Sequence, residues 1–326
     1  MMKEKIVSIQ YLRGLAALGV VFCHYSSSLI LYPLLSVFFS FGQSGVFVFF
    51  LISGFIIVYS LIKSNYETRQ FFTFLLKRSL RIDPPYYVVI LSTLVLFKIL
   101  SHIPSFKGES IDFIPAQFIA HVFYVVPFTK YPFYNHVFWT LCIEFQFYVL
   151  IGVFYFLTNK WWYRVIFLLL FSLSSLIPFS NAYYVVFTYG SIFALGISLV
   201  SFYRERKWQN IIMPLYLITV IAVQFGVPIF ILLFLSCVAI FYFSLIIRPL
   251  AFLGDVSYSL YLTHPIVFIV FSGIAKRLNI DLNSYQLFWL FVEISIALFF
   301  AYVFCLIIEK PSINLSKRIF YKRFTD

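Results

Sequence analysis

Long apolar stretches recur along this chain, and they constrain its fold more than any other feature. Runs of about 20 apolar residues, the length that a helix needs to cross a hydrocarbon layer about 30 Å thick, alternate with short polar segments. Hydrophobic residues make up 62% of the 326 residues and charged residues only 11%. An ordinary soluble domain has about 25% charged residues. The sequence therefore predicts one all-α polytopic membrane domain over residues 1–326; alternating segments of about ten residues, typical of a membrane β-barrel, do not occur.

Ten membrane-spanning helices fit the apolar pattern. Their expected ranges are residues 11–32, 44–62, 84–101, 136–157, 162–178, 183–201, 210–225, 228–247, 256–274 and 285–308. Two further apolar segments are expected not to span. Residues 71–80 suit the cytoplasmic interface, and residues 117–128 suit a re-entrant or interfacial element on the outer side.

The net charge of +12 is explained by the placement of the basic residues. If the expected spans are right, nearly all Lys and Arg residues fall on the side of the N-terminus. The opposite side keeps only Lys98, Lys107, Lys130, Lys276 and Arg277. Because cytoplasmic loops are enriched in Lys and Arg, both termini are expected to be cytoplasmic. The charge is attributed to topology, and no nucleic-acid partner is expected.

Ionisable residues inside the spans are candidates for function, because each costs at least a few kcal/mol in hydrocarbon. The candidates are Arg13 and His24 in the first span, Glu144 in the fourth, His264 in the ninth and Glu293 in the tenth. Glu293 has no motif around it, and we interpret it as structural.

Arg13 and His24 lie on one face of the first helix, about 16 Å apart along its axis at the standard helical rise. Small residues between them allow close approach of another helix or a slim ligand. Glu144 is expected at a depth similar to that of His24, where its carboxylate could orient the imidazole as in acyl transfer. The alternatives are a buried histidine bonded to a neighbouring hydroxyl, a snorkelling arginine, and a protonated Glu144 bonded to Tyr148.

A basic run before the third expected span suits phosphate binding. Lys77 and Arg78 each lie within one helical turn of Arg81, and arginine holds phosphate with two parallel hydrogen bonds. The alternative is that these charges only set topology. Pro84 and Pro85 are expected to end any preceding helix.

A polar stripe runs along the ninth expected span. Ser257, Tyr261 and His264 share one helical face, which must point into the protein. The stripe lines an acyl path or joins helices by hydrogen bonds, and the spacing does not separate these interpretations.

Several segments together resemble the acyltransferase-3 family of bacterial membrane O-acyltransferases. They are Tyr11–Ala17 (YLRGLAA) with His24, Gly45–Phe55 (GVFVFFLISGF), Arg78 with Arg81, Phe138–Glu144 (FWTLCIE), SYSLYLTH ending at His264, and Glu309-Lys310-Pro311. Each motif is weak alone, but they occur in the family's order over almost the whole chain. The resemblance implies a ten-helix bundle in the cytoplasmic (inner) membrane.

What the resemblance implies about function is transfer of an acetyl group from cytoplasmic acetyl-CoA to a hydroxyl of an extracytoplasmic glycan or lipid-linked oligosaccharide, such as O-antigen or capsule. The predicted roles are catalysis by His24 and Glu144, CoA binding by Arg13, Lys77, Arg78 and Arg81, and an acyl or substrate path at Trp139, Tyr261 and His264, with no metal. His24 acts as general base or is itself acetylated. An exporter, a succinyl donor and a lipid acceptor are the alternatives; exporter folds often show repeat symmetry, which this sequence lacks.

Overall fold

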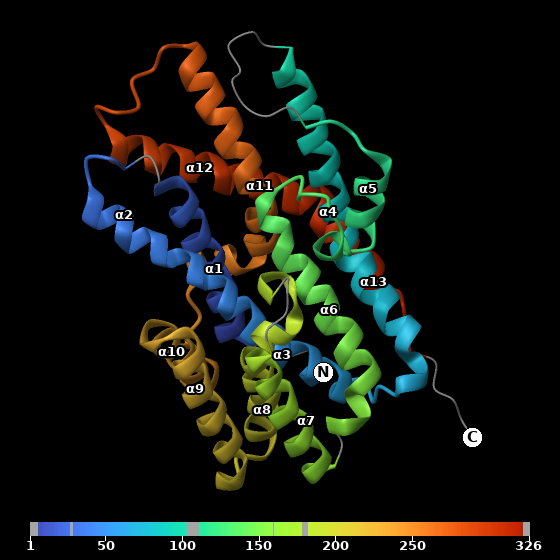
Figure 1. Ribbon diagram of the computed structural model, residues 1–326. Helices are drawn as coiled ribbons and strands as arrows, with labels where there is room; N and C mark the ends of the chain where they lie inside the picture. Colours follow the sequence, from blue (N-terminus) through green and yellow to red (C-terminus); the bar gives the residue numbers. More distant parts are fainter. Residues whose placement is uncertain (1–5, 27–28, 103–110, 159, 178–181, 322–326) are drawn as a thin grey trace.

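The computed structural model describes residues 6–26, 29–102, 111–158, 160–177 and 182–321. These residues form helices and connecting segments, with no strand among them (Figure 1). The α-helices are α1 (Val7–Tyr25), α2 (Pro33–Ser40), α3 (Gly45–Lys63), α4 (Phe71–Ser101), α5 (Pro115–Val122), α6 (Trp139–Phe154), α7 (Trp161–Leu173), α8 (Gly190–Glu205), α9 (Ile212–Phe225), α10 (Val227–Tyr242), α11 (Arg248–Arg277), α12 (Gln286–Phe304) and α13 (Lys310–Lys317). A π-helical turn, η11 (Cys305–Glu309), joins α12 to α13.

The helices confirm an all-α polytopic membrane protein. Within the described residues, eight helical stretches are long and apolar enough to cross a membrane. Two shorter apolar helical stretches, Trp161–Leu176 and Val227–Tyr242, occupy the positions of the fifth and eighth expected spans. The segment 117–128 is short, as expected, because it contains only α5 and the 3₁₀ turn η4 (Val126–Phe128).

The helix α4 differs from the expectation, because it continues through Pro84 and Pro85. The predicted break was wrong, and segment 71–80 forms the first part of this 31-residue helix. Proline removes a backbone donor, but in a packed membrane protein neighbouring helices can satisfy the carbonyls that it frees. Pro84 and Pro85 free the carbonyls of Leu80 and Arg81. Next to them, the hydroxyl of Tyr258 on α11 donates to the carbonyl of Ile82, at 2.8 Å, and ties this part of α4 to α11.

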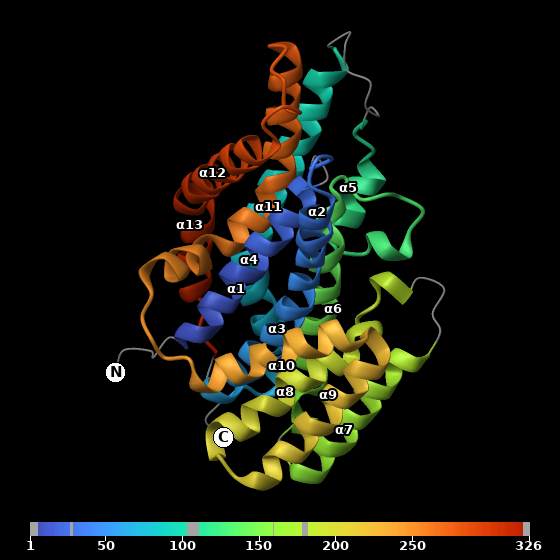
Figure 2. The same ribbon diagram turned by 90° about the vertical axis from the view of Figure 1, so that its left-hand side faces the viewer.

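The second span also begins earlier than expected. The stretch Pro33–Lys63, which contains α2, the 3₁₀ turn η2 (Phe41–Ser44) and α3, forms one helical run. The helix α1 ends at Tyr25. Both views show α2 leading directly into α3 across the middle of the molecule, with α7 to α10 grouped at one end (Figures 1 and 2).

Small residues let α1 pack tightly between α11 and the η2–α3 segment. A Cβ atom added to Gly254 of α11 would lie 2.2 Å from the carbonyl oxygen of Gln10, and one added to Gly45 would lie 2.5 Å from that of Ala16. One added to Gly42 would lie 2.0 Å from the oxygen of Gly19. Any side chain at these glycines would therefore push the backbones apart. This packing fixes the position of Arg13 and His24, both on α1.

Candidate active site

His24 and His264 form a pair of rings between α1 and α11, and we call them the histidine pair. Their ring centroids lie 5.1 Å apart, edge to face. His24 is half-buried in the last turn of α1, and the Gln43 side chain on η2 hydrogen-bonds to its ring. Gln43 carries no signal in the sequence that would identify it, because only the packing of η2 against α1 brings it to the imidazole.

His264 is fully buried and held from both sides. Its Nδ1 lies 3.1 Å from the carbonyl oxygen of Leu260, and its own carbonyl accepts a hydrogen bond from Tyr25, at 2.8 Å. Its Nε2 is buried with no hydrogen-bond partner among the described residues. Because buried polar atoms are nearly always paired, this nitrogen is the kind of group that a bound water or substrate satisfies.

Within the polar stripe of α11, Tyr261 joins helices by hydrogen bonds, which is one of the two interpretations, and the acyl path stays a prediction. The hydroxyl of Tyr261 lies 2.8 Å from that of Thr140 and 3.1 Å from the carbonyl oxygen of Val137. Trp139, the neighbouring residue on α6, packs its indole against the Tyr183 ring at 4.6 Å. Ser257 donates to the carbonyl of Gly254 in its own helix, 2.9 Å away.

The carboxylate of Glu144 accepts hydrogen bonds from α3 and from its own helix, α6. Its Oε1 accepts a hydrogen bond from Ser53, at 2.9 Å, and another from Tyr148. The bond to Tyr148 is the contact expected in the alternative interpretation of Glu144. The predicted orientation of His24 by Glu144 is not among these hydrogen bonds and stays a prediction.

Three guanidinium groups gather beside Glu144, and we call Arg13, Arg78 and Arg81 the arginine cluster. Arg13 interacts electrostatically with Arg81, Glu309 and Glu144, and Arg78 interacts with Arg81 and Glu144. The sequence predicted the neighbouring positions of Arg78 and Arg81 on one helix, whereas the approach of Arg13 depends on the tertiary packing, in which α11 contacts both α1 and α4.

Arg78 is the most enclosed member of the arginine cluster. Its side chain is 9% exposed, and its guanidinium lies over the rings of Phe74, at 5.5 Å, and Tyr148, at 5.9 Å. Its Nε has no hydrogen-bond partner within the described part of the chain. A buried guanidinium donor without a partner suits an anionic ligand, because charge-assisted hydrogen bonds to phosphate or carboxylate would satisfy it.

Lys77 points toward the end of the described chain. Its Nζ donates to the carbonyl of Ile319, at 2.9 Å, and lies 5.5 Å from the centre of the Tyr321 ring. Its predicted role in phosphate binding stays a prediction. The contacts show that the segment after α13 folds back over the start of α4.

Two buried glutamates complete the charged interior. Glu309 in the π-helical turn accepts hydrogen bonds from the backbone N–H and the hydroxyl of Ser259, at 3.2 and 2.5 Å. Glu309 belongs to the motif Glu309-Lys310-Pro311, but no role was predicted for it; an acidic residue at the end of an apolar run was a usable signal. Glu293 is 5% exposed, and its Oε1 has no partner among the described residues.

The described residues contain no cluster of three His, Cys, Asp or Glu side chains that could hold a metal ion. A sequence model of the acyltransferase-3 family, described as an acyltransferase domain, matches residues 6–310. The chain belongs to the acyltransferase-3 family. The match includes the histidine pair and the arginine cluster, so both lie inside the acyltransferase-3 domain of this membrane protein. Comparison with curated proteins and with solved structures finds no match.

Proposed function

We propose that this acyltransferase moves an acetyl group from cytoplasmic acetyl-CoA to a hydroxyl of an extracytoplasmic glycan, as a multi-pass protein of the cytoplasmic membrane. One observation carries the proposal: α1 bears a cation of the arginine cluster, Arg13, and a member of the histidine pair, His24. Eleven helical steps separate them, about 16 Å along the axis. A donor anchored by its phosphates at the cluster would have to extend its thioester over that distance to reach His24.

The donor end of the proposed site is the arginine cluster. The buried and unsatisfied Nε of Arg78 supports an anionic ligand there. Glu144 and Glu309 lie within electrostatic range of Arg13 and offset part of the positive charge when no ligand is bound. The phosphates of CoA would be held by Arg78 and Arg81, with Arg13 above them and Lys77 at the rim.

The acceptor end of the proposed site is the histidine pair. His24 takes the proton of the incoming glycan hydroxyl while the oxygen of that hydroxyl attacks the thioester carbonyl. The C–S bond then breaks, and the CoA thiolate leaves with the proton that His24 carries. Gln43 and the ring of His264 position His24 in this step. In a covalent route, His24 attacks the thioester first, and the glycan hydroxyl then takes the acetyl group from it.

The proposal is tested on the surface polysaccharide of cells with and without this gene, by mass spectrometry and by the acetyl signals in proton NMR. We expect one additional acetyl group per modified unit only when the gene is present. Identical polysaccharides in both strains would contradict the glycan acceptor, and an added mass of another acyl group would contradict the acetyl donor. Purified protein incubated with labelled acetyl-CoA and no acceptor distinguishes the routes, because label retained on His24 requires the covalent one.

A further inference from the structure

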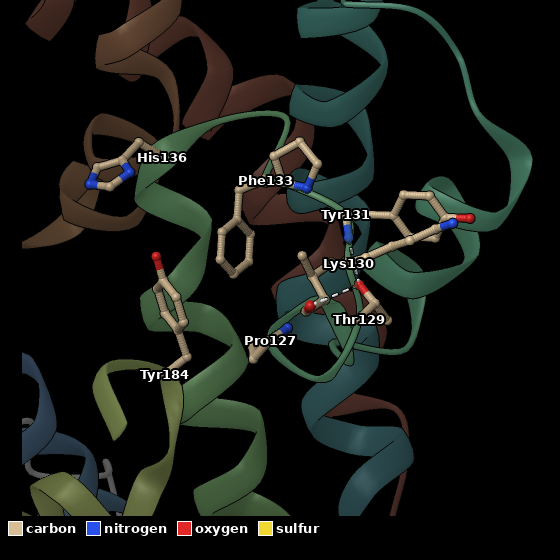
Figure 3. Close-up of a pocket in the computed structure, with 9 residues that line it drawn as sticks. Pro127, Thr129, Lys130, Tyr131, Phe133, His136 and Tyr184 are labelled. Atoms are coloured by element: carbon tan, nitrogen blue, oxygen red, sulfur yellow. Dashed lines mark hydrogen bonds between the residues drawn. The ribbon is translucent and has the colours of Figure 1, made fainter. Parts of the chain in front are cut away.

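A cavity of about 440 Å³ opens between the α5–α6 connection and the turn before α8 (Figure 3). Its walls include Lys130, Tyr131, Phe133 and His136 from the first segment and Tyr184 from the second. The charge pattern of the sequence places this region on the outer side of the membrane. We call it the outer cavity.

Aromatic rings make up much of the wall of the outer cavity. The rings of Phe133 and Tyr184 lie edge to face with centroids 5.5 Å apart, and in Figure 3 they stand beside His136. Aromatic rings bind sugars because a pyranose presents a face of C–H groups that packs on a ring, while its hydroxyls bond to nearby polar groups. A volume of several hundred Å³ with rings and a few polar groups is typical of a small-ligand site.

Among the residues that line the outer cavity, the one with a permanent charge is a cation, Lys130. No aspartate or glutamate is among the lining residues. The ammonium group of Lys130 lies 6.0 Å from the centre of the Tyr131 ring. A cation in a cavity wall that holds no carboxylate favours an anionic ligand over a cationic one.

The loop that carries Lys130 and Phe133 is held in place by hydrogen bonds to α5. Gln117 of α5 donates to the carbonyl of Pro132, at 2.9 Å, and the N–H of Tyr134 donates to Nε2 of His121, at 3.2 Å. His121 is fully buried, and its Nδ1 lies 2.9 Å from the hydroxyl of Tyr86 on α4. The cavity wall is therefore held in place before any ligand binds, which lowers the entropy cost of binding.

The outer cavity is connected to the histidine pair through His136, although neither member of the pair lines it. His136, in its wall, lies within electrostatic range of His24. A second cavity of about 240 Å³ shares His136 and is lined by Pro265, the residue after His264. Tyr184 also contacts the indole of Trp139, with ring centroids 6.4 Å apart. A ligand in the outer cavity would thus lie beside the acceptor end of the proposed site.

We propose that the outer cavity binds an acidic sugar unit of the acceptor glycan, which stacks on Phe133 and Tyr184, and that the exposed side chain of Lys130, which extends along Tyr131 in Figure 3, turns to its carboxylate. This inference rests on the proposed function and adds to it the place and the chemical class of the acceptor. Binding there would hold a sugar hydroxyl next to His136, which lies within electrostatic range of His24.

The test uses methyl β-D-glucuronide and methyl β-D-glucoside. They differ only at C6, which is a carboxylate in the glucuronide and a hydroxymethyl group in the glucoside. Binding to the detergent-purified full chain is measured by saturation-transfer NMR. We expect the wild type to bind the glucuronide more tightly than the glucoside. Lys130→Glu should lower the affinity for the glucuronide at least about fivefold and leave the affinity for the glucoside unchanged. The matched control is Lys98→Glu, which removes a lysine of the same predicted side outside the cavity wall.

The aromatic wall is tested separately. Phe133→Ala and Tyr184→Ala should each lower the affinity for both glycosides about fivefold. Tyr184→Phe keeps the ring and should therefore keep the affinity for the glucoside. Lys130→Glu changes an exposed side chain, so it tests the proposal even where an alanine variant fails to fold. If both glycosides bound equally and Lys130→Glu had no effect on either, the proposal that the ligand is an acidic sugar would be overturned. Unchanged binding in folded Phe133→Ala and Tyr184→Ala would overturn the site.

The two proposals fail in distinguishable ways. The binding experiment needs no acetyl-CoA, so glycoside binding that follows the predicted variants without any acetyl transfer would contradict the proposed function alone. Acetyl transfer to a glycan with no glycoside binding at the outer cavity would contradict only the further inference.

Discussion

The ring of His24 meets the ring of His264 edge to face, with 5.1 Å between their centroids. The two residues are 240 positions apart in the sequence, and they come together because Gly14 and Gly254 allow α1 and α11 to pack backbone against backbone. The contact places a half-buried imidazole against a fully buried one. This arrangement suits a base that must be held in place and still meet a substrate.

Replacing His24 with alanine should reduce acetyl transfer by about 10²–10⁴-fold, because loss of a general base typically has that effect. The amount of protein in the membrane should not change. Transfer is measured with labelled acetyl-CoA in proteoliposomes. His102→Ala is the matched control, since His102 is an exposed histidine at the end of α4. Full activity of the His24 variant would exclude this residue as the base.

Replacing Glu144 with alanine should abolish acetyl transfer, while Tyr148→Phe should keep most of it. The first change removes a carboxylate near the arginine cluster and leaves Ser53 and Tyr148 without their acceptor. The second removes one hydrogen bond and keeps the carboxylate. The same assay compares the two proteins. If both variants lost activity equally, the hydrogen bond to Tyr148 would matter and the charge of Glu144 would not.

Replacing Arg78 with alanine should raise the KM for acetyl-CoA about tenfold or more, because a charge-assisted hydrogen bond contributes about 1.5–3 kcal/mol. The kcat should change less. Initial rates over a range of acetyl-CoA concentrations give both constants. Arg204→Ala, which removes an exposed arginine at the end of α8, is the control. An unchanged KM would exclude the phosphate role. Lys77→Ala should have a smaller effect, since Lys77 already contacts Ile319.

Replacing Gly254 with alanine should lower the free energy of unfolding by about 1–3 kcal/mol, as overpacking of a close contact usually does. The added Cβ would lie 2.2 Å from the carbonyl oxygen of Gln10. The apparent Tm in detergent measures the effect. Gly273→Ala, in the same helix, is the matched control because a Cβ there has no neighbour within 4 Å. Equal Tm values for the two variants would show that α1 and α11 pack less closely than described.

Local patterns in the sequence predicted the membrane helices well, because the length and apolar character of a spanning helix are properties of one segment. The same local reasoning was wrong at Pro84 and Pro85. The proline rule concerns a single helix, whereas this part of α4 is also held by α11, through the hydrogen bond from Tyr258, more than 170 positions away, to the carbonyl of Ile82. Arg78 and Arg81 were predicted as neighbours because one helical turn separates them.

By itself, the sequence determined that the chain is a helical membrane protein with an acyltransferase-3 motif order, and it named His24 and the arginines as the residues to examine. Only the tertiary structure decided their partners: His264 and Gln43 at His24, Ser53 and Tyr148 at Glu144, and Ser259 at Glu309. The physical reason is that helix formation depends on neighbours three or four residues apart. The partner of a buried polar group depends instead on which helix faces pack together, and here glycines in contact with backbone set that packing.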